Sequence, residues 1–256
     1  MSKGKARVNY LGREGLVQHE TQPDYGFLYV ASLAKDPKWD VGDRAVLPDG
    51  RVFRYAKVSS ASTGVAYHGA GGSSTAVVYA TVKASQVIGD KQVTVEKAGI
   101  AADLYRGGYV VVYGASDEAQ TRYIIGNTAS DGDDYIILYL DAPLTAAATS
   151  GATYCEVFTN PYAAITHTPD NYGSVIGLPA ANAAALEYVW VQTWGPCVIS
   201  GGEDLGSPGA EARTLMFDAG GCLWYNANKE NNQYAGFTLN VGSTCYGPLI
   251  MLQISP

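Results

Sequence analysis

Histidine, serine and cysteine offer little catalytic chemistry in this chain. The only histidines are His19, His68 and His167, one in each region of the sequence, and no pair has the i, i+4 spacing of a helical metal site. A serine or cysteine nucleophile needs a positioned histidine as its base, and no Gly-x-Ser-x-Gly motif precedes a predicted helix. The sequence therefore predicts neither a metal centre nor a nucleophilic hydrolase.

Two groups of carboxylates are the other candidates for chemistry. Asp131–Asp134 (Asp-Gly-Asp-Asp) has the oxygen ligands that calcium prefers, but not the longer loop ending in glutamate of an EF-hand. Glu203 and Asp204, with Asp218, would act in glycoside hydrolysis only at a defined separation across a cleft. We predict a solvated hairpin turn at 131–134, and we expect no catalytic pair, since any acidic sequence offers such combinations.

A glycine-rich segment, Gly69–Ser74, superficially resembles a phosphate-binding loop. It lacks the Gly-Lys-Ser/Thr of a P-loop and the three spaced glycines of a dinucleotide fingerprint. The four cysteines contain no Cys-x-x-Cys pair, and we predict that they are buried free thiols rather than disulfides or zinc ligands: Cys155, Cys197, Cys222 and Cys245. No cofactor is predicted.

The composition favours a β-rich body with extensive packed surface. Among 256 residues there are 30 glycines and 19 tyrosines, and only 16% of the residues are charged. The 24 acidic and 17 basic side chains give a net charge of −7, which argues against the broad cationic surface of a nucleic-acid binder. No apolar run suits a membrane span, and the basic N-terminus lacks the apolar region of a secretory signal.

The strongest strand signal lies at Tyr188–Ile199. Valines alternate with Trp190 and Trp194, so both faces of this strand should be covered. Gly195 and Pro196 should bulge or bend it, because proline lacks an N–H and fixes φ. We predict that Trp190, Trp194 and Pro196 belong to the structural core.

Short strands separated by turn residues fill much of the remaining chain. Pro48–Gly50 predicts a tight hairpin turn between strands at 45–47 and 51–58. Strand-like segments then recur at regular spacing, as in a small antiparallel barrel or sandwich: 76–82, 92–96, 108–113, 121–125, 135–140 and 153–158. Later apolar segments at 213–217, 222–225 and 248–254 indicate a second sheet-rich body.

These patterns predict an all-β protein of antiparallel barrel or sandwich units with an extended N-terminal arm. The expected organisation is an arm at 1–38, a β-rich domain at 39–161 containing the hairpin and the barrel or sandwich, and a second β-rich domain at 162–256. Because Tyr25–Val30 is too apolar to remain in solvent, the arm should dock on its own body or on a neighbour.

Three segments, Val41–Tyr55, Phe158–Tyr162 and Tyr188–Cys197, together resemble structural proteins of tailed-bacteriophage virions, of the head decoration or cement type. The similarity covers about 39–199, and it excludes Gly69–Ser74 and the residues after Ile199. The resemblance implies a non-enzymatic capsid-associated role with no catalytic residue to transfer. It also implies self-association, with a trimer expected around a threefold position.

The leading hypothesis is therefore a cement protein, made in the host cytoplasm, that binds the major capsid protein on the outer surface of the assembled head. Its many copies would strengthen the shell through buried aromatic and apolar contacts. The expected contact residues lie in the arm, because a segment that orders on binding can cover a large surface: Val8, Tyr10, Leu16, Tyr25 and Phe27.

Two alternatives remain open. A tail, fibre or baseplate component would bind host-surface glycan by stacking exposed Tyr and Trp rings on sugars, and it predicts that Trp190 or Trp194 is exposed. The cement hypothesis predicts that both are buried. A hydrolase of surface polysaccharide is the least favoured, because it needs paired carboxylates lining a cleft. Direct nucleic-acid and membrane binding are not expected.

Overall fold

The structure is a computed structural model of the 256-residue chain. It describes residues 25–66, 68–72, 80–113, 119–167, 174–199, 213–218, 220–224, 233–240 and 248–256, with the backbone alone of 5–10, 13–18, 78–79 and 225. Regular structure in these residues consists of β-strands and one short 3₁₀ helix, η1 (Gly26–Tyr29). The prediction of an antiparallel all-β fold is confirmed.

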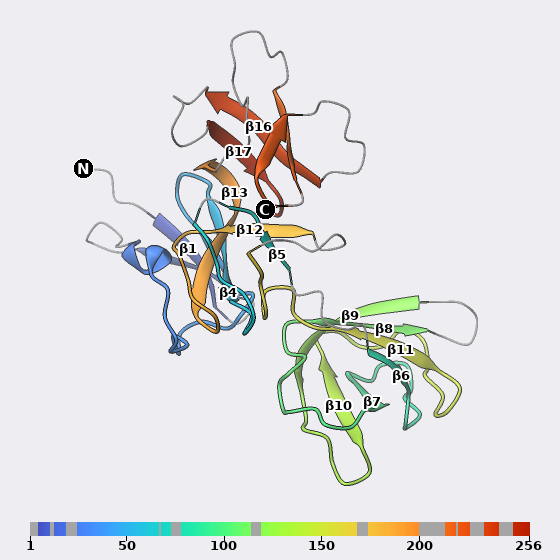
Figure 1. Cartoon of the computed structure of the whole chain (residues 1–256). Helices are drawn as coiled ribbons and strands as arrows, with labels where there is room; N and C mark the ends of the chain where they lie inside the picture. Colours follow the sequence, from blue (N-terminus) through green and yellow to red (C-terminus); the bar gives the residue numbers. More distant parts are fainter. Residues whose placement is uncertain are drawn as a thin grey trace. The chain divides into compact units, whose positions relative to one another are not determined.

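The chain forms two compact units, coloured along the sequence in Figure 1. Unit 1 combines 1–73 with 161–256, and unit 2 is the intervening segment 74–160. This division differs from the predicted domains at 39–161 and 162–256. The physical reason is strand pairing: β4 (Val52–Lys57) pairs with β13 (Tyr188–Val198), so the hairpin belongs with the later sheet. Unit 2 is thus an insertion between the parts of unit 1.

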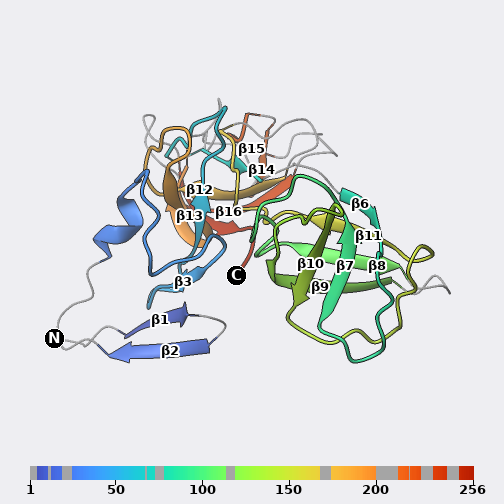
Figure 2. The same cartoon turned by 90° about the horizontal axis from the view of Figure 1, so that it is seen from below.

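Unit 2 is a six-stranded antiparallel barrel (Figure 2). Its sheet order is β6-β11-β8-β9-β10-β7, and the bridge Val82–Val95 joins the two ends of the sheet. Lys83 N–H donates to Thr94 O at 2.8 Å beside this bridge. The strands are β6 (Val78–Thr81), β7 (Gln92–Glu96), β8 (Tyr109–Tyr113), β9 (Ala119–Asn127), β10 (Tyr135–Leu140) and β11 (Tyr154–Phe158). The choice left open between barrel and sandwich is resolved as a barrel.

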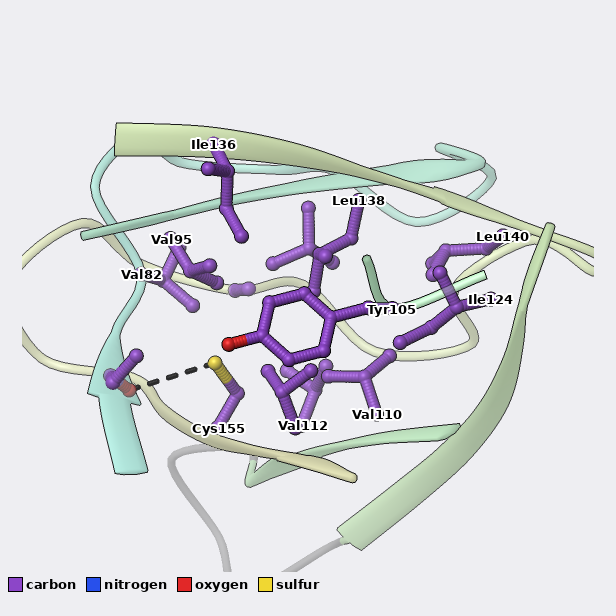
Figure 3. Close-up of a cluster of buried hydrophobic side chains, with 14 of the residues drawn as sticks. Val82, Val95, Tyr105, Val110, Val112, Ile124, Ile136, Leu138, Leu140 and Cys155 are labelled. Atoms are coloured by element: carbon purple, nitrogen blue, oxygen red, sulfur yellow. Dashed lines mark hydrogen bonds between the residues drawn. The ribbon is translucent and has the colours of Figure 1, made fainter. Parts of the chain in front are cut away.

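Alternation along β8, β10 and β11 directs apolar side chains into the barrel interior (Figure 3). In β10, Ile136, Leu138 and Leu140 point inward, whereas Tyr135 and Tyr139 point outward. The buried cluster of the interior is mainly branched and aliphatic, and it also contains Tyr105 and Cys155. Closure removes the exposed edges that an open sheet would leave.

Unit 1 is an open sheet that gathers strands from both ends of the chain. Its main order is β15-β14-β16-β17-β13-β4-β3-β1-β2; off this path, β12 pairs with β13, and β5 pairs with β12. The strands not yet given are β1 (Lys5–Tyr10), β2 (Arg13–Gln18), β3 (Arg44–Val46), β5 (Ala70–Gly71), β12 (Val175–Pro179), β14 (Thr214–Phe217), β15 (Leu223–Tyr225), β16 (Gln233–Asn240) and β17 (Leu249–Gln253). The predicted apolar C-terminal strand is confirmed as β17, which lies between β13 and β16.

The longest strand, β13, organises unit 1. It pairs with β4 along one edge, up to Trp194, and with β12 and then β17 along the other. A register shift lies between Gln192 and Trp194, just before the predicted site of the bulge, whereas Gly195 and Pro196 themselves pair with β17 in continuous register. The Gln192 amide donates to the carbonyls of Trp194, Gly195 and Pro196 at 3.0–3.3 Å, which satisfies these acceptors at the bulge. Proline is therefore accommodated without ending the strand.

The N-terminal region differs from the predicted extended arm. β1 and β2 form an antiparallel hairpin, which joins the sheet through β3 by the pairs Arg7–Val46 and Val8–Ala45 (Figure 2). The residues from Tyr25 onward lead through η1 to a bridge between Ser32 and Tyr188 of β13. Backbone pairing thus organises much of the segment 1–38, because an extended chain beside an open edge can satisfy its hydrogen bonds there.

Candidate interaction surfaces

Trp190 anchors an aromatic cluster on one face of unit 1. Its ring lies 5.0 Å from that of Trp39, 5.1 Å from Tyr55 and 5.7 Å from Phe27, measured between centroids. Phe27 stacks on Trp39 at 5.9 Å with an interplanar angle of 13°. Edge and offset-stacked contacts of this kind add stabilisation beyond the burial of apolar area. The cluster therefore fixes η1 against β4 and β13.

The backbone after η1 is also tied to β13. Ser32 N–H donates to Tyr188 O at 3.1 Å, and Tyr188 N–H donates to Ser32 O at 2.7 Å. Leu28, fully buried, inserts into the same cluster. These contacts hold one side of the segment on the body, so its remaining side chains face solvent.

The outward side of this segment is strongly apolar. Tyr29, Val30 and Leu33 are 49%, 59% and 69% exposed, and Phe27 is 38% exposed at the margin. We call these four residues the apolar ledge. Arg51 donates from Nη1 to Tyr29 Oη at 3.0 Å and is paired with Asp49 at 2.7 Å, so charged groups border the ledge. An apolar centre with a polar rim is the usual anatomy of a protein interface.

The contact residues predicted for the N-terminal arm lie in two parts of unit 1, the β1–β2 hairpin and the segment that contains η1. Val8, Tyr10 and Leu16 lie in β1 and β2, whose side chains fall outside the described residues. Tyr25 is half-buried, and burial followed by the nearby Asp49 charge raises the pKa of its phenol. Phe27 belongs to both the aromatic cluster and the ledge.

Sequence reasoning missed the other three ledge residues, Tyr29, Val30 and Leu33. The apolar run Tyr25–Val30 indicated that this segment docks. Its inward and outward sides became known only from the 3₁₀ turn and the bridge to β13.

The three residues predicted for the core have different environments. Trp190 is a core residue with 2% of its surface exposed, and Val189 and Val191 on the opposite face are fully buried. Trp194 is half-buried, and Pro196 is exposed. The prediction of Pro196 as a core residue is wrong, because β13 passes beyond its pairing with β4 before it reaches this position.

A second surface lies on the outside of the barrel. Tyr109 and Tyr123, opposite each other on β8 and β9, are 45% and 39% exposed, with ring centroids 5.6 Å apart. Phe158 is the cross-strand partner of Tyr109 on β11. Neighbouring positions on three strands thus form an aromatic row on unit 2, with two exposed phenols and the half-buried Phe158.

The candidate acidic residues that the structure describes accept hydrogen bonds within turns. Asp218 accepts hydrogen bonds from the N–H groups of Gly220 and Cys222, both at 2.8 Å, and from Trp224 Nε1 at 2.9 Å, which stabilises the turn between β14 and β15. Asp131 accepts from the N–H groups of Asp133 and Tyr135 within the β9–β10 turn, as predicted for a hairpin turn. Glu203 and Asp204 lie outside the described residues.

Two histidines predicted to be scattered are brought together. The rings of His68 and His167 lie 5.5 Å apart, although the residues belong to different segments of unit 1. His68 Nδ1 lies 3.3 Å from Ala66 O, and His167 N–H donates to Ser62 Oγ at 2.8 Å. Within the described residues, no group of three or more His, Cys, Asp or Glu could hold a metal ion. His19 lies outside them.

The described cysteines are poor nucleophiles. Cys155 and Cys197 are buried free thiols, as predicted; Cys222 is free but only half-buried, and Cys245 falls outside the described residues. Burial raises the pKa of Cys155 and of Cys197 to about 12, so both remain protonated near neutral pH. Burial, with the Asp218 charge, also raises the pKa of Cys222. These thiols act as small packing groups.

Comparison with protein-family models, curated proteins and solved structures gave no match. Among the described residues, no helix has the length and apolar character needed to span a membrane. The surfaces described above are therefore the structural basis for a proposal about function.

Proposed function

We propose that this chain is a non-enzymatic structural protein of a phage virion that binds the outside of the assembled head as a decoration protein. The observation that carries the proposal is the apolar ledge, four exposed apolar side chains on a segment held in place by the buried Trp190 cluster. Its preorganised backbone reduces the ordering cost of association. The proposed partner is the major capsid protein.

Many repeated copies make such a contact effective on a capsid shell. A single strip of four side chains supplies modest affinity, whereas a self-associated protein engages several equivalent capsid sites at once. We propose a homo-oligomer, with a trimer at threefold positions, in which each copy presents its ledge and its β1–β2 hairpin. The role requires no reaction, in keeping with the structural positions of Asp131 and Asp218.

A second candidate is a tail, fibre or baseplate component that binds host-surface glycan, and the aromatic row on the barrel favours it. Exposed phenol rings have an apolar face that stacks on a sugar ring and a hydroxyl that hydrogen-bonds to it. Tyr109 and Tyr123 would supply the stacking surface, since Trp190 is buried. Because Trp190 is buried, one of the two indoles first considered for stacking on sugar rings cannot reach them.

Co-sedimentation with assembled, undecorated phage heads tests the leading proposal. We expect saturable binding that the double variant Val30→Ser, Leu33→Ser weakens at least about tenfold, because burying each apolar side chain contributes about 1.5–3 kcal/mol. The matched control is Val87→Ser, Ile88→Ser, which removes two side chains of similar exposure, 65% and 67%, from the barrel. A chain lacking residues 1–22 measures the contribution of the hairpin.

Equal head binding by the ledge variant and its control would overturn the ledge as the contact. Absence of head binding by the unaltered chain would reject the decoration role. Binding to host envelopes instead, lost in Tyr109→Ser, Tyr123→Ser, would support the glycan-binding alternative.

A further inference from the structure

Two arginines face each other across the β3–β4 ladder. Arg44 and Arg54 are direct cross-strand partners. Tyr55 N–H donates to Asp43 O, and Leu47 N–H donates to Arg51 O, both at 2.9 Å. Because hydrogen-bonded and non-hydrogen-bonded pairs alternate along an antiparallel ladder, Arg44 and Arg54 form a non-hydrogen-bonded pair. The Cα atoms of such pairs lie about 4.5 Å apart, and their side chains are close.

This arrangement is unfavourable without a counter-charge, since like charges directly opposite one another destabilise a sheet. Among the residues that the structure describes, no carboxylate forms an ion pair with either arginine. The adjacent Asp43 uses its Oδ2 to accept from Asp40 N–H at 2.8 Å.

The hydrogen-bonding capacity of the pair is also largely unused within the described part of the chain. Arg54 donates from Nη1 to Gly42 O at 3.1 Å, but Nε of Arg54 and Nε of Arg44 are buried without an acceptor. A buried donor without a partner costs about 1–3 kcal/mol. Each residue as a whole is only half-buried, so part of each side chain reaches solvent.

The surroundings of the pair strengthen any charge-assisted contact. Arg54 lies on the same face of β4 as Ala56, and its partner on β13 is Val191, both fully buried. Beside an apolar cluster the effective dielectric constant is lower than in water, and attraction between opposite charges is larger. A guanidinium offers a planar set of donors that matches two oxygens of one anion.

We propose that Arg44 and Arg54 form a binding site for an oxyanion group, either a carboxylate or a phosphate. The anion would accept from the unused donors of both guanidiniums and neutralise their repulsion. The source is either a free anion or an acidic group on a binding partner, and the two share this chemistry. This site is independent of the apolar ledge and of the proposed virion role.

Thermal unfolding of the full chain tests the site, with increasing inorganic phosphate or acetate against chloride at equal ionic strength. We expect a saturable rise in melting temperature with at least one of the two anions, as for a ligand that binds only the folded state. Each of Arg44→Met and Arg54→Met should weaken this binding about tenfold, and the double variant should abolish it. Methionine retains an apolar stem, so all variants should remain folded in chloride.

The matched control is Arg106→Met, which removes an exposed arginine paired with Asp103 in the barrel and should respond to anions as the unaltered chain does. A response to phosphate alone would assign the site to phosphate groups, and a response to acetate would extend it to carboxylates. The proposal is overturned if neither anion gives a saturable shift, or if the double variant and the unaltered chain respond equally.

Discussion

At the scale of single residues, burial sets the chemistry of the described polar groups. Cys155 lies fully buried among valines and isoleucines of the barrel, and its Sγ donates to Ala80 O at 3.5 Å (Figure 3). A thiolate at this position would lose its hydration without gaining a cation, which explains the raised pKa. The residue therefore contributes to packing, and its titration affects stability only in alkali.

The pKa of Cys155 predicts a specific loss of stability at high pH. Burial raises it from 9.0 to about 12, so above pH 9 the unfolded chain releases a proton that the folded barrel retains. The associated stability is fully present below pH 9 and is lost as pH rises through 12, at up to about 1.4 kcal/mol per pH unit. Denaturant unfolding of Cys155→Ala between pH 8 and 11 should show a shallower decline than the unaltered chain.

All other ionisable groups are the same in both proteins, so the difference between the two slopes isolates the thiol. Cys222→Ala is the control, since Cys222 is only half-buried and its removal should change the slope less. Equal slopes for Cys155→Ala and the unaltered chain would contradict this prediction.

At the scale of elements, β13 shows how one strand serves several partners. Its first half pairs with β4, and its second half continues along β17 after the bulge between Gln192 and Trp194. Gly195 makes this possible because its φ of +96° is readily adopted only by glycine, and because a Cβ at this position would meet the backbone of Arg51. Gly195 thus lets β13 pack closely against the β3–β4 hairpin while it pairs with β17.

Substitution of Gly195 by alanine should therefore destabilise unit 1 by about 1–3 kcal/mol, through the positive φ and a contact between the new Cβ and Arg51. That Cβ would lie 2.9 Å from Arg51 Cα. Gly50→Ala is the matched control in the same unit: its φ is +87°, but nothing lies within 4 Å of the added Cβ. Chemical denaturation should show the larger loss for Gly195→Ala, and equal losses would exclude the steric component.

At the scale of the whole molecule, the barrel is a self-contained insertion. Its first and last strands, β6 and β11, are paired neighbours, with Val78 opposite Val157. The two ends of the insertion therefore lie close together, as in domains that can be inserted into a loop of another. Among its described residues, the barrel also has its own core of 15 buried residues, from Ala80 to Val157.

A fragment containing residues 74–160 should consequently fold by itself and unfold cooperatively. Replacing the same residues in the full chain by a short Gly-Ser linker should leave unit 1 folded, since β4 and β13 then remain paired. Dispersed NMR spectra and a single thermal transition for each product are the expected results. An unfolded fragment would show that the barrel depends on unit 1 for its stability.

Much of the local structure was predictable from the sequence. The turn at Pro48–Gly50, the barrel strands and the covered strand around Trp190 follow from alternation and turn chemistry, which act between near neighbours. By contrast, β12 and β16 were missed. The segment of β12 is short and contains Gly177 and Pro179, whereas polar residues and Gly236 interrupt the apolar pattern of β16. Neighbouring strands compensate for these weak patterns.

The sequence by itself determined the all-β class, the small antiparallel barrel or sandwich and the docking of the apolar segment near Tyr25. Only the tertiary structure decided that the hairpin joins β13, that the barrel is an insertion, and that Arg44 and Arg54 face one another beside a buried cluster. It also divided the segment after Tyr25 into the buried Leu28 and the exposed ledge. Alternation reveals which residues share a face of a strand, but pairing between strands distant in sequence depends on contacts that only the folded chain creates.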